Sequence, residues 1–206
     1  DGKIAAAGRR PVALTNEAAT RRVHLMRAQS DAILIGIGTA LADDPQLTCR
    51  LPGMAALSPV RVVLDSHLRL PEASRLVQGA REVPLWILTS LPPDAPRAVA
   101  LAARGARVIQ VGSAADGLDL NQGLRELAAN GVTRLMVEGG ARVAARFVSG
   151  GLVDEVRLVQ TPRIIGADGV DALDGLPLSS ITEAANFKRA DAEWIGEDQL
   201  TVYERS

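Results

Sequence analysis

Aromatic residues, cysteine and histidine are scarce in this chain, and each scarcity excludes a class of function. Aromatic side chains make up 2% of the 206 residues, too few to form a platform on which nucleic-acid bases stack. Cys49 is the only cysteine and has no partner for an internal disulfide, so we expect a reducing, cytoplasmic compartment. His24 and His67 are the only histidines, and because no Cys/His cluster has metal-ligand spacing, we expect no metal.

An excess of charge and a long apolar run are also missing. The formal net charge is −1, which argues against a general binder of nucleic acid. No segment approaches the roughly 18 uninterrupted apolar residues of a membrane span, so we expect no membrane partner. Neither a Gly-x-Ser-x-Gly elbow nor a Gly-x4-Gly-Lys-Ser/Thr loop occurs, which disfavours a serine hydrolase and a P-loop nucleotidase.

Short apolar runs alternate with longer segments of helical periodicity. The predicted strands are residues 32–37, 60–65, 85–89, 108–111, 134–138 and 155–161. The predicted helices are residues 16–28, 94–104, 118–130 and 140–149. Strands that are separated by helices predict an α/β fold with a mostly parallel central sheet.

The C-terminal part of the sequence follows a different pattern. Residues 186–194 and 199–204 are strand-like and are joined by Ile195-Gly-Glu-Asp, a plausible hairpin turn. We therefore expect antiparallel strands at the C-terminal edge. No repeat or linker interrupts the sequence, so residues 1–206 are predicted to form a single domain. The first five residues resemble the end of a strand, so we expect that the N-terminus is truncated.

Ligands of open α/β sheets bind beyond the carboxyl ends of the strands, and three stretches are expected there: residues 36–50, Leu64-Asp65-Ser66-His67 and the stretch from Val137 to Arg142. In Glu138-Gly139-Gly140 the glycines allow close approach of a phosphate, and the next helix offers free N–H groups. The alternative is a tight strand-to-helix turn without a ligand. The stretch GIGTALADDPQLTCR at residues 36–50 is not a Rossmann fingerprint, because Leu41 occupies the third glycine position.

Asp43 and Asp44 are two adjacent carboxylates before Pro45. Either both cap local backbone N–H groups, or one of them faces a ligand as a hydrogen-bond acceptor or proton-transfer group. His24 is expected on the surface of its helix, and Cys49 is expected to be a small buried apolar residue rather than a nucleophile.

Several segments together resemble the reductase domain of riboflavin biosynthesis, the C-terminal half of a bifunctional deaminase/reductase. They are Asp1-Gly-Lys-Ile-Ala, the stretch from Arg27 to Arg50, Arg61-Val-Val-Leu-Asp-Ser, Val137-Glu-Gly-Gly and Leu152-Val-Asp-Glu. The resemblance implies a fold similar to dihydrofolate reductase, with antiparallel C-terminal edge strands, and a homodimer. It also implies NADPH-dependent reduction of the ribosyl side chain of 5-amino-6-(5-phosphoribosylamino)uracil to the ribityl form.

The resemblance further implies roles for individual residues. The substrate contacts would be Arg27, Leu47, Arg50 and Glu138. The cofactor contacts would be Thr39, Asp43, Ser66, Gly139, Gly140, Ala141, Arg142, Val143, Ala144, Ala145 and Arg146. The catalytic residues would be Lys3 at the opened sugar, Asp43 near the reacting carbon and Glu138. Asp44 would shape the turn, and Ser66 with His67 or Arg69 would lie near the adenosine 2′-phosphate.

The chain departs from this family in one loop. Pro11 and Ala13 stand where a serine and a tryptophan are usual, and Arg9 or Arg10 is expected to compensate. The His-x-Glu and Pro-Cys-x-x-Cys motifs of the deaminase are absent, so a deaminase domain is expected elsewhere in the same protein or in a separate chain. Two other functions stay open: a related reductase of a pterin or dihydrofolate-like substrate, and a non-catalytic nucleotide-binding module.

Overall fold

The computed structural model describes residues 1–9 and 13–206, and its contacts divide the chain into two compact units. The central unit comprises His24–Gly139, and the terminal unit comprises Asp1–Val23 together with Gly140–Ser206. That both units belong to one domain stays a prediction. Arg10 and Pro11, which were singled out in the sequence, lie outside the described residues.

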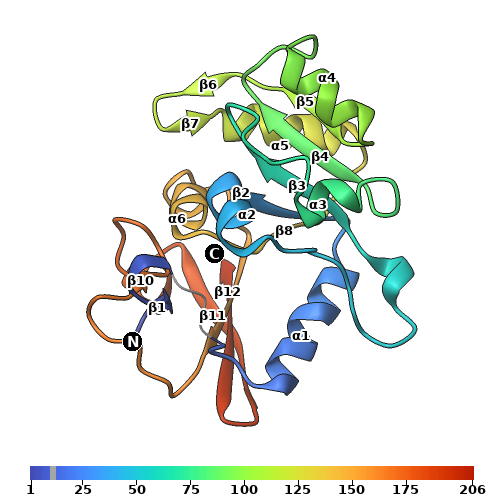
Figure 1. The fold of residues 1–206 in the computed structure, drawn as a ribbon. Coiled ribbons are helices and arrows are strands. Elements are labelled where there is room, and N and C mark those ends of the chain that lie inside the picture. Colours follow the sequence, from blue (N-terminus) through green and yellow to red (C-terminus); the bar gives the residue numbers. More distant parts are fainter. Residues whose placement is uncertain (10–12) are drawn as a thin grey trace. The chain divides into compact units, whose positions relative to one another are not determined.

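The central unit contains a five-stranded parallel sheet in the order β5-β4-β3-β2-β8 (Figure 1). The strands are β2 (Ala32–Gly36), β3 (Val60–Leu64), β4 (Leu85–Thr89), β5 (Arg107–Gln110) and β8 (Leu135–Val137). All five residues of β2 are buried, which explains why its sequence is apolar without alternation. The predicted parallel sheet is confirmed.

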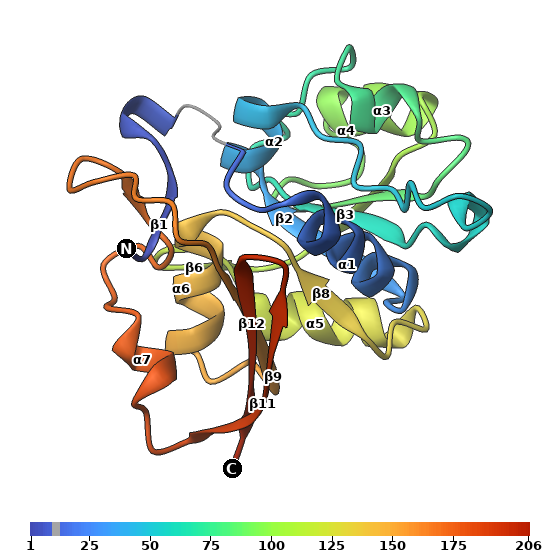
Figure 2. The same cartoon turned by 90° about the horizontal axis from the view of Figure 1, so that it is seen from below.

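Helices cover both faces of this sheet. Side chains of α2 (Ile37–Asp43), α3 (Arg75–Gln78) and α4 (Pro96–Ala103) share one buried cluster with Ile33, Ile35 and Val63. The helix α5 (Leu120–Ala129) packs on the opposite face, where Gly123 lies close to the Leu88 side chain. Figure 2 shows α3 and α4 on one side of β2 and β3 and α5 on the other. The sequence predicts no helix in residues 37–59, yet α2 and the 3₁₀ turn η2 (Ala55–Leu57) form there.

The terminal unit contains a three-stranded antiparallel sheet in the order β11-β12-β9. β9 (Glu155–Gln160) lies beside β12 (Asp198–Arg205), which forms a hairpin with β11 (Phe187–Ile195). Gly196, with φ of 65°, lies in the turn of this hairpin, so the predicted C-terminal hairpin is confirmed. The unit also contains α6 (Ala141–Ser149), α7 (Ser179–Thr182) and the pair of β1 (Lys3–Ala5) with β10 (Val170–Asp171).

The remaining elements are short, apart from the first helix. α1 (Glu17–Ala28) begins in the terminal unit and ends in the central one. Asn16 caps it, because its Oδ1 accepts a hydrogen bond from the Ala19 N–H at 2.8 Å. The others are η1 (Ala7–Arg9) and the hairpin of β6 (Ser113–Ala114) and β7 (Gly117–Leu118). Within the described residues no helix has the length and apolar character needed to cross a membrane.

Candidate active site

The parallel sheet has a topological switch point between β2 and β8. β2 lies between β3 and β8, and the chain passes from β2 to β3 directly but reaches β8 only after it has left β5 at the far edge. Open α/β sheets bind ligands beyond the carboxyl ends of their strands at such a point. The residues that follow β2 and β8 are therefore the natural candidates for a site.

Two glycines form the turn that follows β8. Gly139 and Gly140 have φ of 157° and 84°, backbone conformations that residues other than glycine rarely adopt. A Cβ atom on Gly139 would lie 3.6 Å from the Thr39 Cγ2 atom, so the turn passes close to α2. Gly140 is the N-cap of α6 and provides no side chain to cap its first turn. A glycine turn before an uncapped helix suits a phosphate group.

Thr39 and Asp43 lie four residues apart on α2, so they share one side of that helix. Thr39 is half-buried beside Gly139. Asp43 is exposed at the last turn, and its carboxylate makes no hydrogen bond or ion pair within the described residues. Both residues were expected to contact a cofactor. The structure places Thr39 beside the Gly139 turn at the switch point, and Asp43 about one turn further along the same side of α2.

Asp44 ends α2 and begins the next turn. Its backbone is left-handed, with φ of 39° and ψ of 57°, and its N–H donates to the Ala40 carbonyl at 3.2 Å. Its Oδ1 accepts a hydrogen bond from the backbone N–H of Arg75 at 2.8 Å, at the start of α3. The sequence predicted that Asp44 shapes the turn, and this geometry agrees. The contact with α3 was not predicted, because the partner is 31 positions away.

Arg27 of α1 and Glu138 after β8 form an ion pair. The Arg27 Nε donates to Glu138 Oε2 at 2.6 Å, and its Nη2 donates to Oε1. The Nη1 atom donates to the Thr48 carbonyl at 3.1 Å. The Arg27 side chain is 10% exposed and that of Glu138 is 24% exposed. Arg27 is thus paired with Glu138, which the sequence analysis also named as a substrate contact.

Arg50 lies next to His24, another residue of α1. The Arg50 N–H donates to His24 Nδ1 at 3.2 Å, so the neutral ring carries its proton on Nε2. Burial lowers the pKa of His24 below 6.5, and the nearby cations Arg27 and Arg50 add to the effect. The expectation that His24 lies on the surface is wrong: it is 7% exposed. Its position three residues before Arg27 places both on one helix face, a signal that was overlooked.

Leu47 and Cys49 lie in the segment between Asp44 and Arg50. Leu47 is 3% exposed, packs into the central core and has a φ of 55°, which is uncommon for such a side chain. A substrate contact from Leu47 would therefore use its backbone. Cys49 is a buried free cysteine, as expected.

Ser66 follows β3 and lies in a turn. Its carbonyl accepts hydrogen bonds from the hydroxyls of Thr89 at 3.1 Å and Ser90 at 2.9 Å. Its own hydroxyl makes no hydrogen bond within the described residues. The neighbouring His67 and Arg69 are exposed, so this turn presents polar groups that can meet a ligand.

In the terminal unit, Lys3 of β1 donates to Asp171 Oδ1 of β10 at 2.7 Å. The Lys3 side chain is 16% exposed, and its Cγ lies 3.0 Å from the position of a Cβ on Gly169. In α6, the side chains of Val143 and Ala145 are buried. Contacts of these two residues with a cofactor would therefore use the backbone. In the described part of the chain no group of three His, Cys, Asp or Glu side chains is arranged to hold a metal ion.

A family model described as the RibD C-terminal domain matches residues 1–201. The chain is 36% identical over 205 residues to a 2,5-diamino-6-ribosylamino-4(3H)-pyrimidinone 5′-phosphate reductase of Methanothermobacter thermautotrophicus, covering 98% of this chain and 92% of that protein. It is also 36% identical over 200 residues to the riboflavin biosynthesis protein RibD of Bacillus amyloliquefaciens, covering 96% of this chain and 53% of that protein.

A solved structure from Thermotoga maritima has the same fold. It is named a diaminohydroxyphosphoribosylaminopyrimidine deaminase/5-amino-6-(5-phosphoribosylamino)uracil reductase. The TM-score is 0.79 at 27% identity, and the match covers 100% of this chain and 54% of that one. The chain therefore spans about half the length of its bifunctional relatives and nearly all of the archaeal one.

Proposed function

Because the chain belongs to the family of the RibD C-terminal domain, we propose that it reduces the ribosyl side chain of a phosphorylated ribosylaminopyrimidine to the ribityl form in riboflavin biosynthesis. The proposed substrate is 5-amino-6-(5-phosphoribosylamino)uracil, and the proposed reductant is NADPH. The names of the relatives support a reductase of this pathway but differ in the pyrimidine that is reduced. The order of reduction and deamination is therefore part of the test.

The convergence of polar groups at the switch point carries the proposal. Thr39 and Asp43 after β2, Glu138 and Gly139 after β8, and Arg27 bound to Glu138 all belong to the central unit. They combine a cation paired with an acid, an exposed carboxylate and a glycine turn. Such a set can orient a polar, phosphorylated substrate beside a dinucleotide without a covalent nucleophile.

The residues of the chain fit a nicotinamide dinucleotide. The Gly139-Gly140 turn and the N-terminus of α6, which has no side-chain cap, suit a pyrophosphate. The Ser66 hydroxyl, which makes no hydrogen bond within the described residues, suits a further phosphate. We propose that Thr39, Asp43, Ser66 and the stretch 139–146 hold the cofactor. When bound, its nicotinamide supplies the hydride that reduces C1′ of the ring-opened imine.

The substrate side of the proposal rests on Arg50 and on the Arg27–Glu138 pair. Arg27 uses three of its five N–H donors on Glu138 and Thr48, which leaves two without an acceptor among the described residues. Arg50 is exposed, so it is the stronger candidate for the terminal phosphate, and Arg27 adds its remaining donors. The Glu138 carboxylate, oriented by Arg27, would accept hydrogen bonds from the pyrimidine or from sugar hydroxyls.

Asp43 and Lys3 are proposed to act at the reacting sugar, Asp43 in proton transfer and Lys3 as a contact. Reduction of the imine adds a hydride to carbon and a proton to nitrogen, so one group must supply that proton. Asp43 is exposed and unpaired within the described residues, and we propose it for this role. Lys3 is proposed to contact the opened sugar, with its ammonium group oriented by Asp171.

The proposal includes a cytoplasmic homodimer and a deaminase in the same protein or in a separate chain. The support for the deaminase is that the match covers 53% of the RibD relative and that the Thermotoga protein is named a deaminase/reductase. The buried free Cys49 agrees with a reducing compartment.

Oxidation of NADPH by the purified chain tests the function. The deaminated ribosylaminouracil phosphate, its undeaminated precursor and dihydrofolate would be compared in parallel, each also with NADH. Turnover of one ribosylaminopyrimidine supports the proposal and fixes the order in the pathway. Turnover of dihydrofolate alone favours the pterin-type reductase, and NADPH binding without turnover of any substrate favours a nucleotide-binding module.

A further inference from the structure

The loop of residues 65–72, here called the Ser66 loop, has an unusually well-anchored backbone. It follows β3 and carries Ser66, the residue proposed for the adenosine 2′-phosphate. Leu68 has a left-handed backbone with φ of 51°, and Leu68 and Leu70 are buried in the core of the central unit. Between Asp65 and Leu70 the more exposed side chains are those of Ser66, His67 and Arg69. The loop thus alternates between core residues and polar residues that face solvent.

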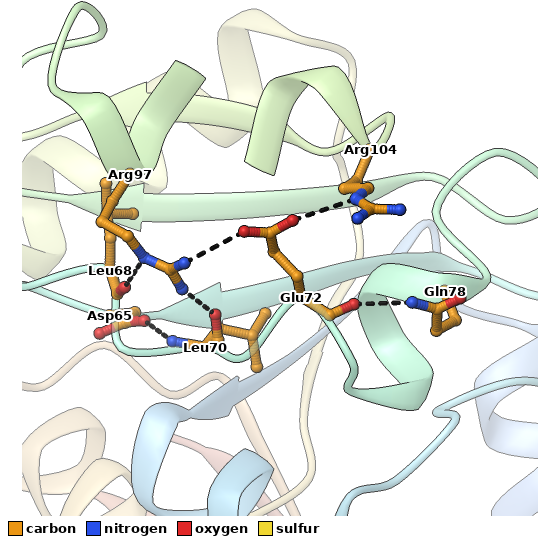
Figure 3. Close-up of polar contacts among 7 residues, drawn as sticks. All are labelled: Asp65, Leu68, Leu70, Glu72, Gln78, Arg97 and Arg104. Atoms are coloured by element: carbon orange, nitrogen blue, oxygen red, sulfur yellow. Dashed lines mark hydrogen bonds and ion pairs between the residues drawn. The ribbon is translucent and has the colours of Figure 1, made fainter. Parts of the chain in front are cut away.

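One guanidinium group from α4 holds three residues of this loop (Figure 3). The Arg97 Nε donates to the Leu68 carbonyl at 3.3 Å, and Nη2 donates to the Leu70 carbonyl at 2.7 Å. Its Nη1 donates to Glu72 Oε1 at 3.3 Å, and Glu72 also receives a hydrogen bond from Arg104 at 3.1 Å. The planar fork of an arginine suits such a set of bonds, whereas a lysine ammonium does not.

Asp65 holds the same loop from inside. Its side chain is fully buried, and its Oδ2 accepts a hydrogen bond from the Leu70 N–H at 2.8 Å. Its Oδ1 has no hydrogen-bond partner in the described structure and lies 3.9 Å from the Nε of Arg69. A buried carboxylate oxygen without a hydrogen bond is costly. Its charge attracts Arg69, a cation three residues after Ser66.

These contacts fix the backbone of the loop but leave the Ser66 hydroxyl without a partner among the described residues. Hydrogen bonds to the backbone would stabilise any loop, so they alone do not indicate a ligand site. A free hydroxyl and two exposed basic side chains on a fixed backbone instead resemble a preorganised anion site. Arg97 itself would not contact the anion, because its Nε and Nη2 atoms donate to backbone carbonyls of the loop.

We propose that Arg97 is a positioning residue that sets the preference of this protein for NADPH over NADH. This inference rests on the proposed function. Arg97 fixes the carbonyls of Leu68 and Leu70 and thereby the places of Ser66 and Arg69. The 2′-phosphate, which NADH lacks, is the group that these side chains would meet, so loss of Arg97 weakens NADPH binding selectively.

Arg97→Met tests the proposal, because it keeps the aliphatic stem and removes all three bonds. We expect the KM for NADPH to rise about tenfold, while the KM for NADH, the KM for the pyrimidine and kcat stay within about twofold of wild type. Arg104→Met is the matched control, since it removes an arginine from the same Glu72 but leaves the bonds to the Leu68 and Leu70 carbonyls in place. Arg97→Lys, which keeps the charge but concentrates its donors on one ammonium nitrogen, should retain only part of the NADPH affinity.

Three results would overturn the proposal: an equal rise of the KM for NADPH and NADH in Arg97→Met, no rise for either, or the same effect in Arg104→Met. If circular dichroism shows that Arg97→Met does not fold, the KM values for NADPH and NADH are compared in Arg97→Lys instead. A wild type that turns over the pyrimidine equally well with NADPH and NADH contradicts this inference but leaves the reductase. A wild type without turnover contradicts the proposed function, and binding of NADP⁺ and NAD⁺ by calorimetry then decides the role of Arg97.

Discussion

Arg27 and Glu138 form an ion pair through two hydrogen bonds, although they lie 111 positions apart in the sequence. The pair joins α1 to the end of β8, and the third bond of Arg27 reaches the Thr48 carbonyl. Two residues that were both expected to touch a substrate therefore also hold each other. Breaking the pair should disturb stability and substrate binding together.

Glu138→Ala is expected to lower the free energy of unfolding by about 1–3 kcal/mol, because it leaves a largely buried guanidinium without its partner. Glu138→Gln keeps an oxygen that accepts from Arg27 and should lose less stability. Both variants should raise the KM for the pyrimidine substrate, since both remove the carboxylate. Urea unfolding and steady-state kinetics measure the two effects.

Glu155→Ala is the matched control for these variants. Glu155 forms a surface ion pair with Arg157 at 2.6 Å, so its loss should change stability by less than about 1 kcal/mol. If Glu138→Ala is as stable as this control, the Arg27–Glu138 pair does not hold the site together. If the KM for the pyrimidine does not change in either Glu138 variant, the proposed substrate contact is wrong.

Substitutions of Asp43 and Asp44 should affect different properties: turnover for Asp43 and stability for Asp44. Asp43→Asn is expected to reduce kcat by about 10²–10⁴-fold without a change in stability, because it removes only a group proposed for proton transfer. Asp44→Ala should cost about 1 kcal/mol or more, because the hydrogen bond from the Arg75 N–H is lost and alanine disfavours the left-handed backbone. Kinetics and thermal unfolding of both variants check this division.

Each of these two variants serves as the control for the other. Unchanged turnover in Asp43→Asn would show that the carboxylate does not act in the reaction. A loss of turnover in Asp44→Ala that matches the loss in Asp43→Asn, at unchanged stability, would mean that the assignment of roles is reversed.

The sheets were predictable from the sequence because their apolar patterns are local. The parallel strands are short, nearly continuous apolar runs, and the C-terminal hairpin is bounded by a glycine turn. α2 was missed because its seven residues contain Gly38 and Thr39 and follow a strand without a side-chain N-cap. Its left-handed end at Asp44 is defined by the structure and not by a sequence signal.

The contacts that organise the site could not be predicted, because they join residues far apart in the sequence. The motif that contains Asp65 was recognised, but its partner at Leu70 and the role of Arg97 depend on how the loop folds. His24 was assigned to the surface because a helix pattern alone does not show which face is covered. Family resemblance suggested which residues meet ligands, whereas only the structure shows that Arg27 and Glu138 meet each other.

Asp31 links the start of β2 to the segment before β8. Its Oδ2 accepts hydrogen bonds from the Thr133 hydroxyl at 2.7 Å and from the N–H groups of Thr133 and Arg134 at 2.8 Å. The Thr133 hydroxyl, together with these N–H groups, lowers the pKa of Asp31 below 3.8. The folded state therefore binds the proton less readily than the unfolded state.

The stabilisation from Asp31 should be fully present above pH 3.8 and should be lost as the pH falls through the lower folded pKa. Asp31→Asn should be less stable at neutral pH and should lose this part of the acid dependence. Urea unfolding of both proteins through the acid range measures the difference. If the two curves stay parallel at all pH values, the hydrogen bonds of Asp31 do not depend on its charge.

His24 should make substrate binding depend on pH. Its folded pKa lies below the ordinary 6.5 because of burial and of the cations Arg27 and Arg50, which outweigh the opposing effects of the Thr48 backbone and Glu138. Stabilisation by the neutral ring is fully present above pH 6.5 and is lost as the pH falls through the folded pKa. In that window Nδ1 becomes protonated and can no longer accept the Arg50 N–H.

The KM for the phosphorylated substrate should therefore rise as the pH falls, by about fivefold for a loss of roughly 1 kcal/mol. In His24→Leu the KM should be raised at all pH values and should lack this step, because the hydrogen bond to Arg50 is already missing. The KM for NADPH, measured in the same series, is the internal control and should not share the step. A pyrimidine KM that shows the same pH profile in wild type and in His24→Leu would mean that another group titrates, and His24 would then serve only to fill the core.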